Sequence, residues 1–270
     1  MTFTRTAGVR YDMPVSYGPS IAPPVSQGFE TYTTTITYRT SRDAIGELLP
    51  EWFLPADDQV VTAVYTRMVN MEWMGGRNYN IVSVSANVVC VCTPEPIAGP
   101  YTLAIWESDC APILAGREYM GSPKLFGVIP DADIFEGEFS FRCSEYEAPL
   151  VDGTVSQMRE MTPAELEAAA EAGRNRVGFN WKYIPGFGDE PDISYPTALY
   201  MAYQFDRGAR GHGTFSFGTP TDIEAPYSAK IVRTLAKLPL LEHVDTISLH
   251  SAYSYLFRDR TRRLDVPAAG

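Results

Sequence analysis

A lysine stands at a turn that leads into an apolar run. Lys124 follows the Gly-Ser-Pro stretch at 121–123 and precedes Leu125 and Phe126. Because the residue before a proline avoids helical geometry, this pattern predicts a fixed corner at which a strand begins. Burial of an ammonium group favours the neutral amine, which can attack a carbonyl carbon to form a Schiff base. The alternative is an ordinary lysine whose stem covers apolar surface while its charge stays in water.

Two motifs around this lysine resemble those of a known family. Gly116-Arg117-Glu118 precedes Gly121, Pro123 and Lys124, and upstream Thr37-Tyr38-Arg39-Thr40 precedes Leu48-Leu49-Pro50. In order and spacing they resemble the G-R-E … G-x-P-K and Y-R-T-D … L-P signatures of the acetoacetate decarboxylase superfamily, over roughly residues 30–260. The resemblance implies a mainly β fold, an antiparallel barrel or meander, in which Lys124 matches the imine-forming lysine.

The chain departs from the decarboxylases beside the lysine. Those enzymes carry a second lysine at the next position, which is Leu125 here, and neither of two family glutamates is clearly retained. Alignment places Ile81 at one glutamate position, and Tyr65 or Thr66 at the other. Divergent members without the second lysine are associated with pyruvate aldolase-dehydratase or hydratase activity, and this chain resembles them more.

The resemblance therefore implies a Schiff-base lyase acting on a small 2-oxo acid. One alternative is a decarboxylase of acetoacetate or another 3-oxo acid. A second alternative is a barrel that binds an apolar ligand without chemistry. No cofactor is implied, since the lysine itself is the electron sink. The family also implies a homo-oligomer.

Three further residues are candidates for proton transfer. Glu118 could serve as the acid or base in place of the family glutamates, or form a structural ion pair with Arg117. Tyr79 and Tyr253 could each shuttle a proton in an aldol or dehydration step, or be core aromatics whose hydroxyl groups find partners.

A second group of residues is expected to bind the substrate. Arg39 matches the family arginine and could bind a substrate carboxylate through two hydrogen bonds, or pair with Glu118. The other residues expected around the pocket are Asn80, Met120, Trp73 and Leu125.

The remaining chain reads as strands with a few short helices. Alternation predicts strands at 29–38, 59–71, 79–91, 101–107, a pair within 133–147, and then 198–205, 214–218 and 246–257. Helices are predicted at 41–49, 163–173 and 228–238, with Thr162 and Glu165 forming a capping box before the second. Residues 174–196 read as irregular. Residues 1–30 read as an extended arm, and 31–270 as a single domain.

Composition limits the partners and the compartment. The chain has 22 Lys and Arg against 33 Asp and Glu, a net charge of −11, which argues against nucleic acid or an anionic membrane surface as partner. Its start lacks the apolar stretch of a signal peptide, so a cytoplasmic protein is expected. The four cysteines and three histidines show no metal-binding spacing, and free thiols are expected.

Overall fold

The computed structural model describes residues 4–135 and 138–266. Residues 1–3 of the expected arm and residues 136–137 of the expected strand pair lie outside the described residues. Within those ranges, no helix is both long and apolar enough to cross a membrane.

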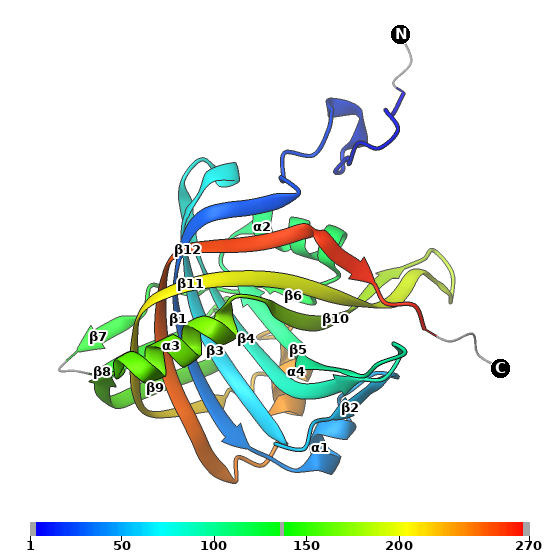
Figure 1. Ribbon diagram of the computed structural model, residues 1–270. Coiled ribbons are helices and arrows are strands. Elements are labelled where there is room, and N and C mark those ends of the chain that lie inside the picture. Colours follow the sequence, from blue (N-terminus) through cyan, green and yellow to red (C-terminus); the bar gives the residue numbers. More distant parts are fainter. Residues whose placement is uncertain (1–3, 136–137, 267–270) are drawn as a thin grey trace.

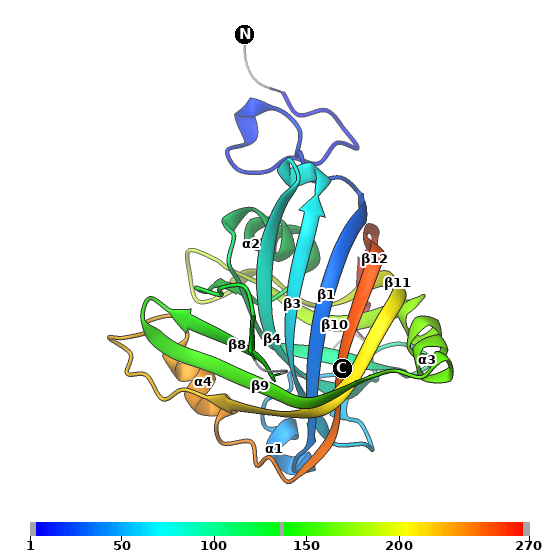
Figure 2. The ribbon, with the colours of Figure 1, turned by 90° about the vertical axis from the view of Figure 1, so that its left-hand side faces the viewer.

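One large sheet, mostly antiparallel, makes up the fold (Figure 1). Its order is β10-β5-β4-β3-β1-β12-β11-β9-β8-β7, and β10 also pairs with β11, so that seven strands pair in a closed circuit. Two pairings, β5 with β6 and β5 with β10, are parallel. Figure 2 shows β3, β1, β12 and β11 side by side. The strands are β1 (Val25–Arg39), β2 (Phe53–Pro55), β3 (Val60–Met71), β4 (Arg77–Cys90), β5 (Ile97–Glu107), β6 (Lys124–Phe126), β7 (Asp133–Phe135), β8 (Glu138–Glu145), β9 (Ala148–Glu160), β10 (Arg176–Pro185), β11 (Pro191–Phe217) and β12 (Glu242–Arg263).

The two faces of this sheet differ in composition. Along β4, Val82, Val84 and Ala86 are buried, while the intervening Ser83 and Ser85 are half-buried. The apolar face packs into the main core, which includes α4 (Ala229–Leu235), and the Trp106 indole donates to the Ser228 hydroxyl just before that helix, at 3.0 Å. Alternation along a strand places side chains on opposite faces, so a more polar face remains on the other side.

The mainly β meander is confirmed, with two corrections to the predicted strands. Residues 174–196, expected to be irregular, contain β10 and the start of β11. The prolines and glycines there suggested loops, but the aromatic residues between them supply the pairing surface. The strands expected at 198–205 and 214–218 form one continuous β11. Its glycines lie where a Cβ would collide, as at Gly208, 2.5 Å from the Met161 sulfur.

Four α-helices occur among the described residues, against the three that were expected. α1 (Arg42–Gly46), α3 (Pro163–Gly173) and α4 lie within or at the predicted ranges, and α3 has the predicted capping box. The additional helix, α2 (Cys110–Ala115), begins after Asp109, whose carboxylate accepts from the Ala111 amide. Pro112 lies inside α2 and resembles a helix-breaking signal, whereas the predicted segment at 41–49 has its proline only after the helix, so the sequence did not reveal α2. Short 3₁₀ turns lie at Val15–Tyr17 and Glu72–Met74.

Candidate active site

Lys124 is the first residue of β6 and is buried. As predicted, the turn before it ends where the strand begins. The residue is only 7% exposed, and its Nζ lies 2.6 Å from Oε1 of Glu107. The same Nζ donates to the carbonyl oxygen of Pro112 in α2, at 3.1 Å. Lys124 is therefore held between the end of β5 and the first turn of α2.

Glu107, the last residue of β5, has no solvent exposure. Burial raises the pKa of the Glu107 carboxyl, and the charge of Lys124 offsets part of that rise. Apart from the ion pair, neither oxygen has a well-aligned hydrogen-bond partner among the described residues. The carboxyl is thus free to exchange a proton with a molecule bound at the amine.

The Gly-Arg-Glu motif shapes the space around the lysine. Gly116 begins a π-helical turn, Gly116–Met120, that continues α2. A Cβ on Gly116 would lie 2.3 Å from Cδ and 2.7 Å from Nζ of Lys124, so only glycine leaves room for the amine. The Arg117 side chain donates to the main-chain oxygen of Lys124 at 2.9 Å. Such π-helical turns are frequent at functional sites.

Tyr79 and Arg258 belong to the same buried cluster. Burial raises the pKa of the Tyr79 hydroxyl well above its ordinary value, and the charge of Glu107 raises it further. The positive charge of Arg258 opposes this rise. Arg258 is 3% exposed, and its Nη1 donates to the carbonyl oxygen of Pro23 at 3.0 Å and to the Ser26 hydroxyl at 2.5 Å.

Pairing in the sheet places the reactive side chains on one face. Ile105 of β5 is in register with Lys124, and Glu107 is in register with Ile81 of β4, two residues from Tyr79. Lys124, Glu107 and Tyr79 therefore point to the same side of the sheet. The structure thus brings two of the predicted site residues, Lys124 and Tyr79, to one face of the sheet.

Two predicted residues lie away from Lys124 and Glu107. Arg39 is exposed, and its Nε lies 3.1 Å from a Glu242 oxygen instead of pairing with Glu118. Tyr253 is 37% exposed and lies against Gly28, and among the described residues it forms no hydrogen bond with Lys124. Arg39 is the last residue of β1, whereas Tyr253 lies in the middle of β12, opposite Gln204 of β11.

Glu118 faces the N-terminal arm. Burial and the nearby Asp12 raise the pKa of the Glu118 carboxyl, while Lys182 lowers it. The Glu118 main-chain oxygen accepts from Lys182, and Asp12 accepts from the neighbouring Tyr119 hydroxyl. The expected pairing of Glu118 with Arg117 is not among the ion pairs of the described residues.

The four predicted pocket residues lie in different surroundings. Met120 is buried, and its carbonyl accepts from the Thr197 hydroxyl at 2.8 Å. The Arg258 guanidinium lies over the ring of Trp73, with its Cζ atom 5.2 Å from the centre of that ring. Asn80 points to the opposite face from Tyr79 and donates to the Ile129 carbonyl and to Asp131. Leu125 packs on the main core, so position 125 faces away from the Lys124 amine.

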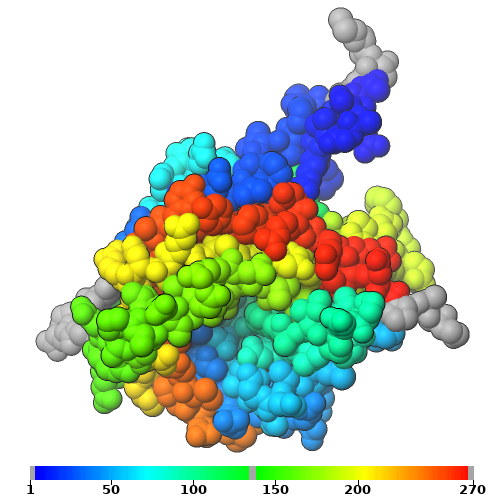
Figure 3. Space-filling view, viewed as in Figure 1, coloured from blue at the N-terminus to red at the C-terminus, as the bar shows by residue number. Residues whose placement is uncertain are grey.

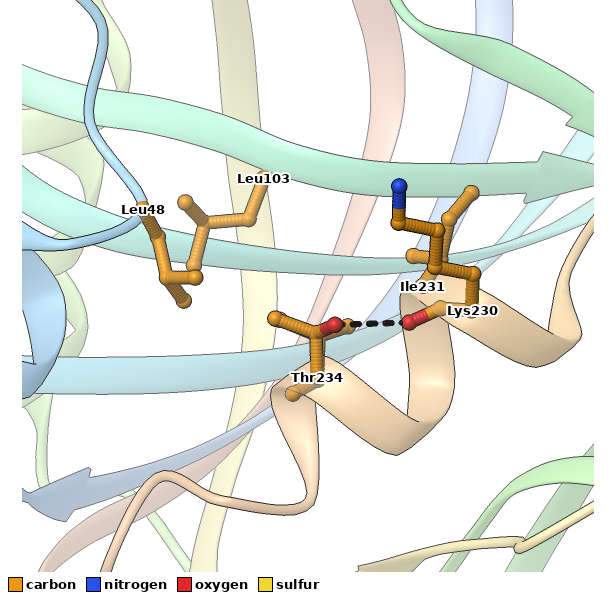
Figure 4. Close-up of a pocket in the computed structure, with 6 residues that line it drawn as sticks. Leu48, Leu103, Lys230, Ile231 and Thr234 are labelled. Atoms are coloured by element: carbon orange, nitrogen blue, oxygen red, sulfur yellow. Dashed lines mark hydrogen bonds between the residues drawn. The ribbon is translucent and has the colours of Figure 1, made fainter.

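Two cavities lie outside the immediate surroundings of the lysine. A cavity of about 440 Å³ lies beside the cluster, lined by Ile21, Pro23, Val25, Ser26, Gln27, Phe29, Met71, Glu72 and Trp73. A smaller one of about 240 Å³ lies between α4 and β5 and is mostly apolar (Figure 4). The space-filling view also shows a hollow between the segments containing α3 and β5 (Figure 3).

Two members of the cluster were not identified from the sequence. Glu107 ends an apolar strand just before the lysine motif, and an acidic residue at that place was an available signal. Arg258 lies in a charged stretch at the end of the last long strand, where nothing local distinguishes it from exposed arginines. In the described part of the chain, no group of three or more His, Cys, Asp or Glu could hold a metal ion.

Comparison with known proteins identifies the family of this chain. The family model "Acetoacetate decarboxylase (ADC)" matches residues 12–256. An acetoacetate decarboxylase from Burkholderia ambifaria is 27% identical over 213 residues, 78% of this chain and 77% of the relative.

Solved structures share the fold. An acetoacetate decarboxylase structure superposes with a TM-score of 0.77 at 15% identity, covering 96% of this chain and 97% of the other. The enduracididine biosynthesis enzyme MppR, complexed with pyruvate, gives 0.68 at 18% identity, covering 96% and 99%. Enzymes of this family are lyases, and because the family model covers most of the sequence, the chain belongs to the acetoacetate decarboxylase family.

Proposed function

We propose that this protein is a Schiff-base-forming lyase that acts on a small 2-oxo acid through an imine on Lys124. The observation that carries the proposal is the buried pair of Lys124 and Glu107, with nitrogen and oxygen 2.6 Å apart. An amine and a carboxyl at hydrogen-bond distance can exchange a proton, and the exchange produces the neutral nucleophile.

The reaction would begin with attack of the neutral Lys124 amine on the keto carbon. Water leaves, and a carbon–nitrogen double bond replaces the carbon–oxygen double bond. Glu107 can take the proton lost by the amine and give it to the departing hydroxyl, because its raised pKa suits both roles. The resulting iminium ion accepts the electron pair of a bond broken beside the former carbonyl. Tyr79, whose hydroxyl stays protonated, can then donate a proton to the product carbon or to a leaving hydroxyl.

Two observations favour a 2-oxo acid as substrate. The MppR structure of the same fold is complexed with pyruvate. In addition, Leu125 stands where the decarboxylases have their second lysine. Both support aldolase-dehydratase or hydratase chemistry.

A decarboxylase of a 3-oxo acid is the second candidate. The Burkholderia relative is named acetoacetate decarboxylase. A buried Glu107 carboxylate beside the imine would also repel a substrate carboxylate, and that repulsion favours loss of carbon dioxide.

Borohydride trapping tests the proposal. Wild type, Lys124→Met and the matched control Lys182→Met are each incubated with pyruvate or with acetoacetate and reduced with borohydride. The mass of each intact protein is then measured by mass spectrometry. We expect a pyruvate adduct on wild type and on Lys182→Met, and none on Lys124→Met. An adduct from acetoacetate together with released carbon dioxide would support the decarboxylase instead. No adduct on wild type with either acid would refute imine chemistry.

The proposal extends to assembly as a homo-oligomer through the arm at 1–30. Figure 1 shows residues 4–24 projecting from the sheet, whereas the last part of the expected arm, from Val25, already belongs to β1. Its Met13, Tyr17 and Ile21 are 81%, 88% and 78% exposed. Apolar side chains exposed to this degree favour contact with another protein surface. Light scattering on the full chain and on a chain lacking residues 1–20 tests this, since only the full chain should assemble.

A further inference from the structure

Arg258 is a buried cation without an acidic partner. It is 3% exposed, and no carboxylate of the described residues lies within 4 Å of its guanidinium. Two of its contacts are to neutral oxygens, those of Pro23 and Ser26. Its Nε has no hydrogen-bond partner among the described residues. Buried arginines are usually paired, because an unpaired charge is costly to remove from water.

We propose that Arg258 binds the carboxylate of the substrate and thereby selects oxo acids over uncharged carbonyl compounds. This inference rests on the proposed function, since it concerns the same site. It assigns to Arg258 the role that the sequence suggested for Arg39.

The charges of the buried cluster support this assignment. With its amine protonated, Lys124 is balanced by Glu107, and Arg258 adds one uncompensated positive charge. A substrate carboxylate would bring the cluster to neutrality. The balance persists after imine formation, because the iminium ion carries the same charge as the ammonium group that it replaces.

The position of Arg258 fits contact with a molecule held at the lysine. The charges of Arg258 and Glu107 both act on the hydroxyl of Tyr79: Glu107 raises its pKa and Arg258 lowers it. Pro23, Ser26 and Trp73, which contact Arg258, also line the cavity of about 440 Å³. Phe29 and Met71 line the same cavity and pack in one cluster with Tyr79. Arg258 thus lies between the cavity and the reactive residues.

Arg39 does not fit this role. Pairing in the sheet connects Glu107 through β4 and β3 to Thr33 of β1. Arg39 lies six residues further along β1, about 20 Å away at about 3.3 Å per residue. It is also exposed and already paired with Glu242.

The test compares a charged and an uncharged substrate. Imine trapping is measured against concentration for pyruvate and for its methyl ester, on wild type, Arg258→Met, Arg258→Lys and the matched control Arg260→Met, an exposed arginine on the same strand. We expect Arg258→Met to raise the half-saturating pyruvate concentration about 10- to 100-fold, the worth of a charge-assisted hydrogen bond, and to change the ester less than threefold. Arg258→Lys should lose less than Arg258→Met, and Arg260→Met should match wild type. Equal losses for acid and ester, or no loss for either, would overturn the inference.

A binding measurement separates this inference from the proposed function. Pyruvate affinity is measured by calorimetry on Lys124→Met and on Lys124→Met combined with Arg258→Lys or Arg258→Met, where no imine can form. Weaker binding in the double variants supports Arg258 even if wild type traps no substrate. Unchanged binding refutes the role of Arg258, whatever the trapping result.

Discussion

Replacing Gly116 by alanine tests whether the space beside the lysine amine is required. Gly116 has ordinary helical dihedral angles, φ −66° and ψ −44°, so its backbone accepts alanine, which favours a helix by about 1 kcal/mol over glycine. The added methyl would lie 2.3, 2.4 and 2.7 Å from Cδ, Cε and Nζ of Lys124. Carbon atoms in contact are about 3.5–4.0 Å apart, so the lysine must move by more than about 1 Å.

That displacement has two expected consequences. Moving the amine by about 1 Å should slow imine formation about 100-fold or more, because reaction rates are this sensitive to position. Crowding should destabilise the fold by about 1–3 kcal/mol, offset in part by the helix preference. The assay is the rate of borohydride trapping with pyruvate, together with thermal unfolding. The control is Gly178→Ala, where the nearest atom would be at 3.6 Å. If Gly116→Ala traps pyruvate at the wild-type rate, the Lys124 amine does not react from its position beside Gly116.

Three further predictions follow from burial and charge. Tyr79→Phe should lower turnover about 100-fold while leaving imine trapping nearly unchanged, since the hydroxyl acts after the imine forms; equal losses in both would contradict this order. The folded protein holds the Glu107 proton more tightly than the unfolded chain, so this carboxyl contributes stability below about pH 4.5 that is lost as the pH rises through the raised pKa. The unfolding free energy of wild type minus that of Glu107→Gln, measured in urea, should therefore fall as the pH rises above about 4.5, and a constant difference would refute the shift. Iodoacetamide should alkylate the exposed Cys110 first, because the other three thiols are buried and burial raises the pKa of Cys92 to about 12; mass spectrometry of peptides would reveal any other order.

The strands were predictable where one face of the sheet is buried. In β4, buried and half-buried residues alternate from Asn80 to Cys90, and the sequence shows the same alternation. The strands within residues 174–196 were not predicted, because Pro185, Pro191 and Pro196 resemble loop signals. In the structure Pro185 ends β10, Pro191 begins β11, and Pro196 lies within β11 opposite Trp181. The helix α2 was not predicted, because a helix this short is stabilised by its contacts with the rest of the fold and not by its composition.

The candidate site was predictable in part. Lys124 was found because its motif is local, with glycine, arginine and proline all within nine residues. Glu107 and Arg258 could not be assigned in the same way, because their roles depend on contacts between distant segments. Arg258 bonds to Ser26, 232 residues away, and no spacing rule connects the two. The motif of Arg39 is equally local, but the structure places Arg39 at the end of β1, where it pairs with Glu242.

The parallel pairing of β5 and β6 has an evolutionary consequence. Main-chain hydrogen bonds set the register of Ile105 with Lys124, so the amine and the Glu107 carboxylate are positioned by the sheet. The other walls come from separate segments: the arm, the turn at Glu72–Met74 and the end of β12. Substitutions in those segments can change which molecule is accepted without moving the amine. A scaffold of this kind can diversify its substrates while its chemistry is inherited unchanged.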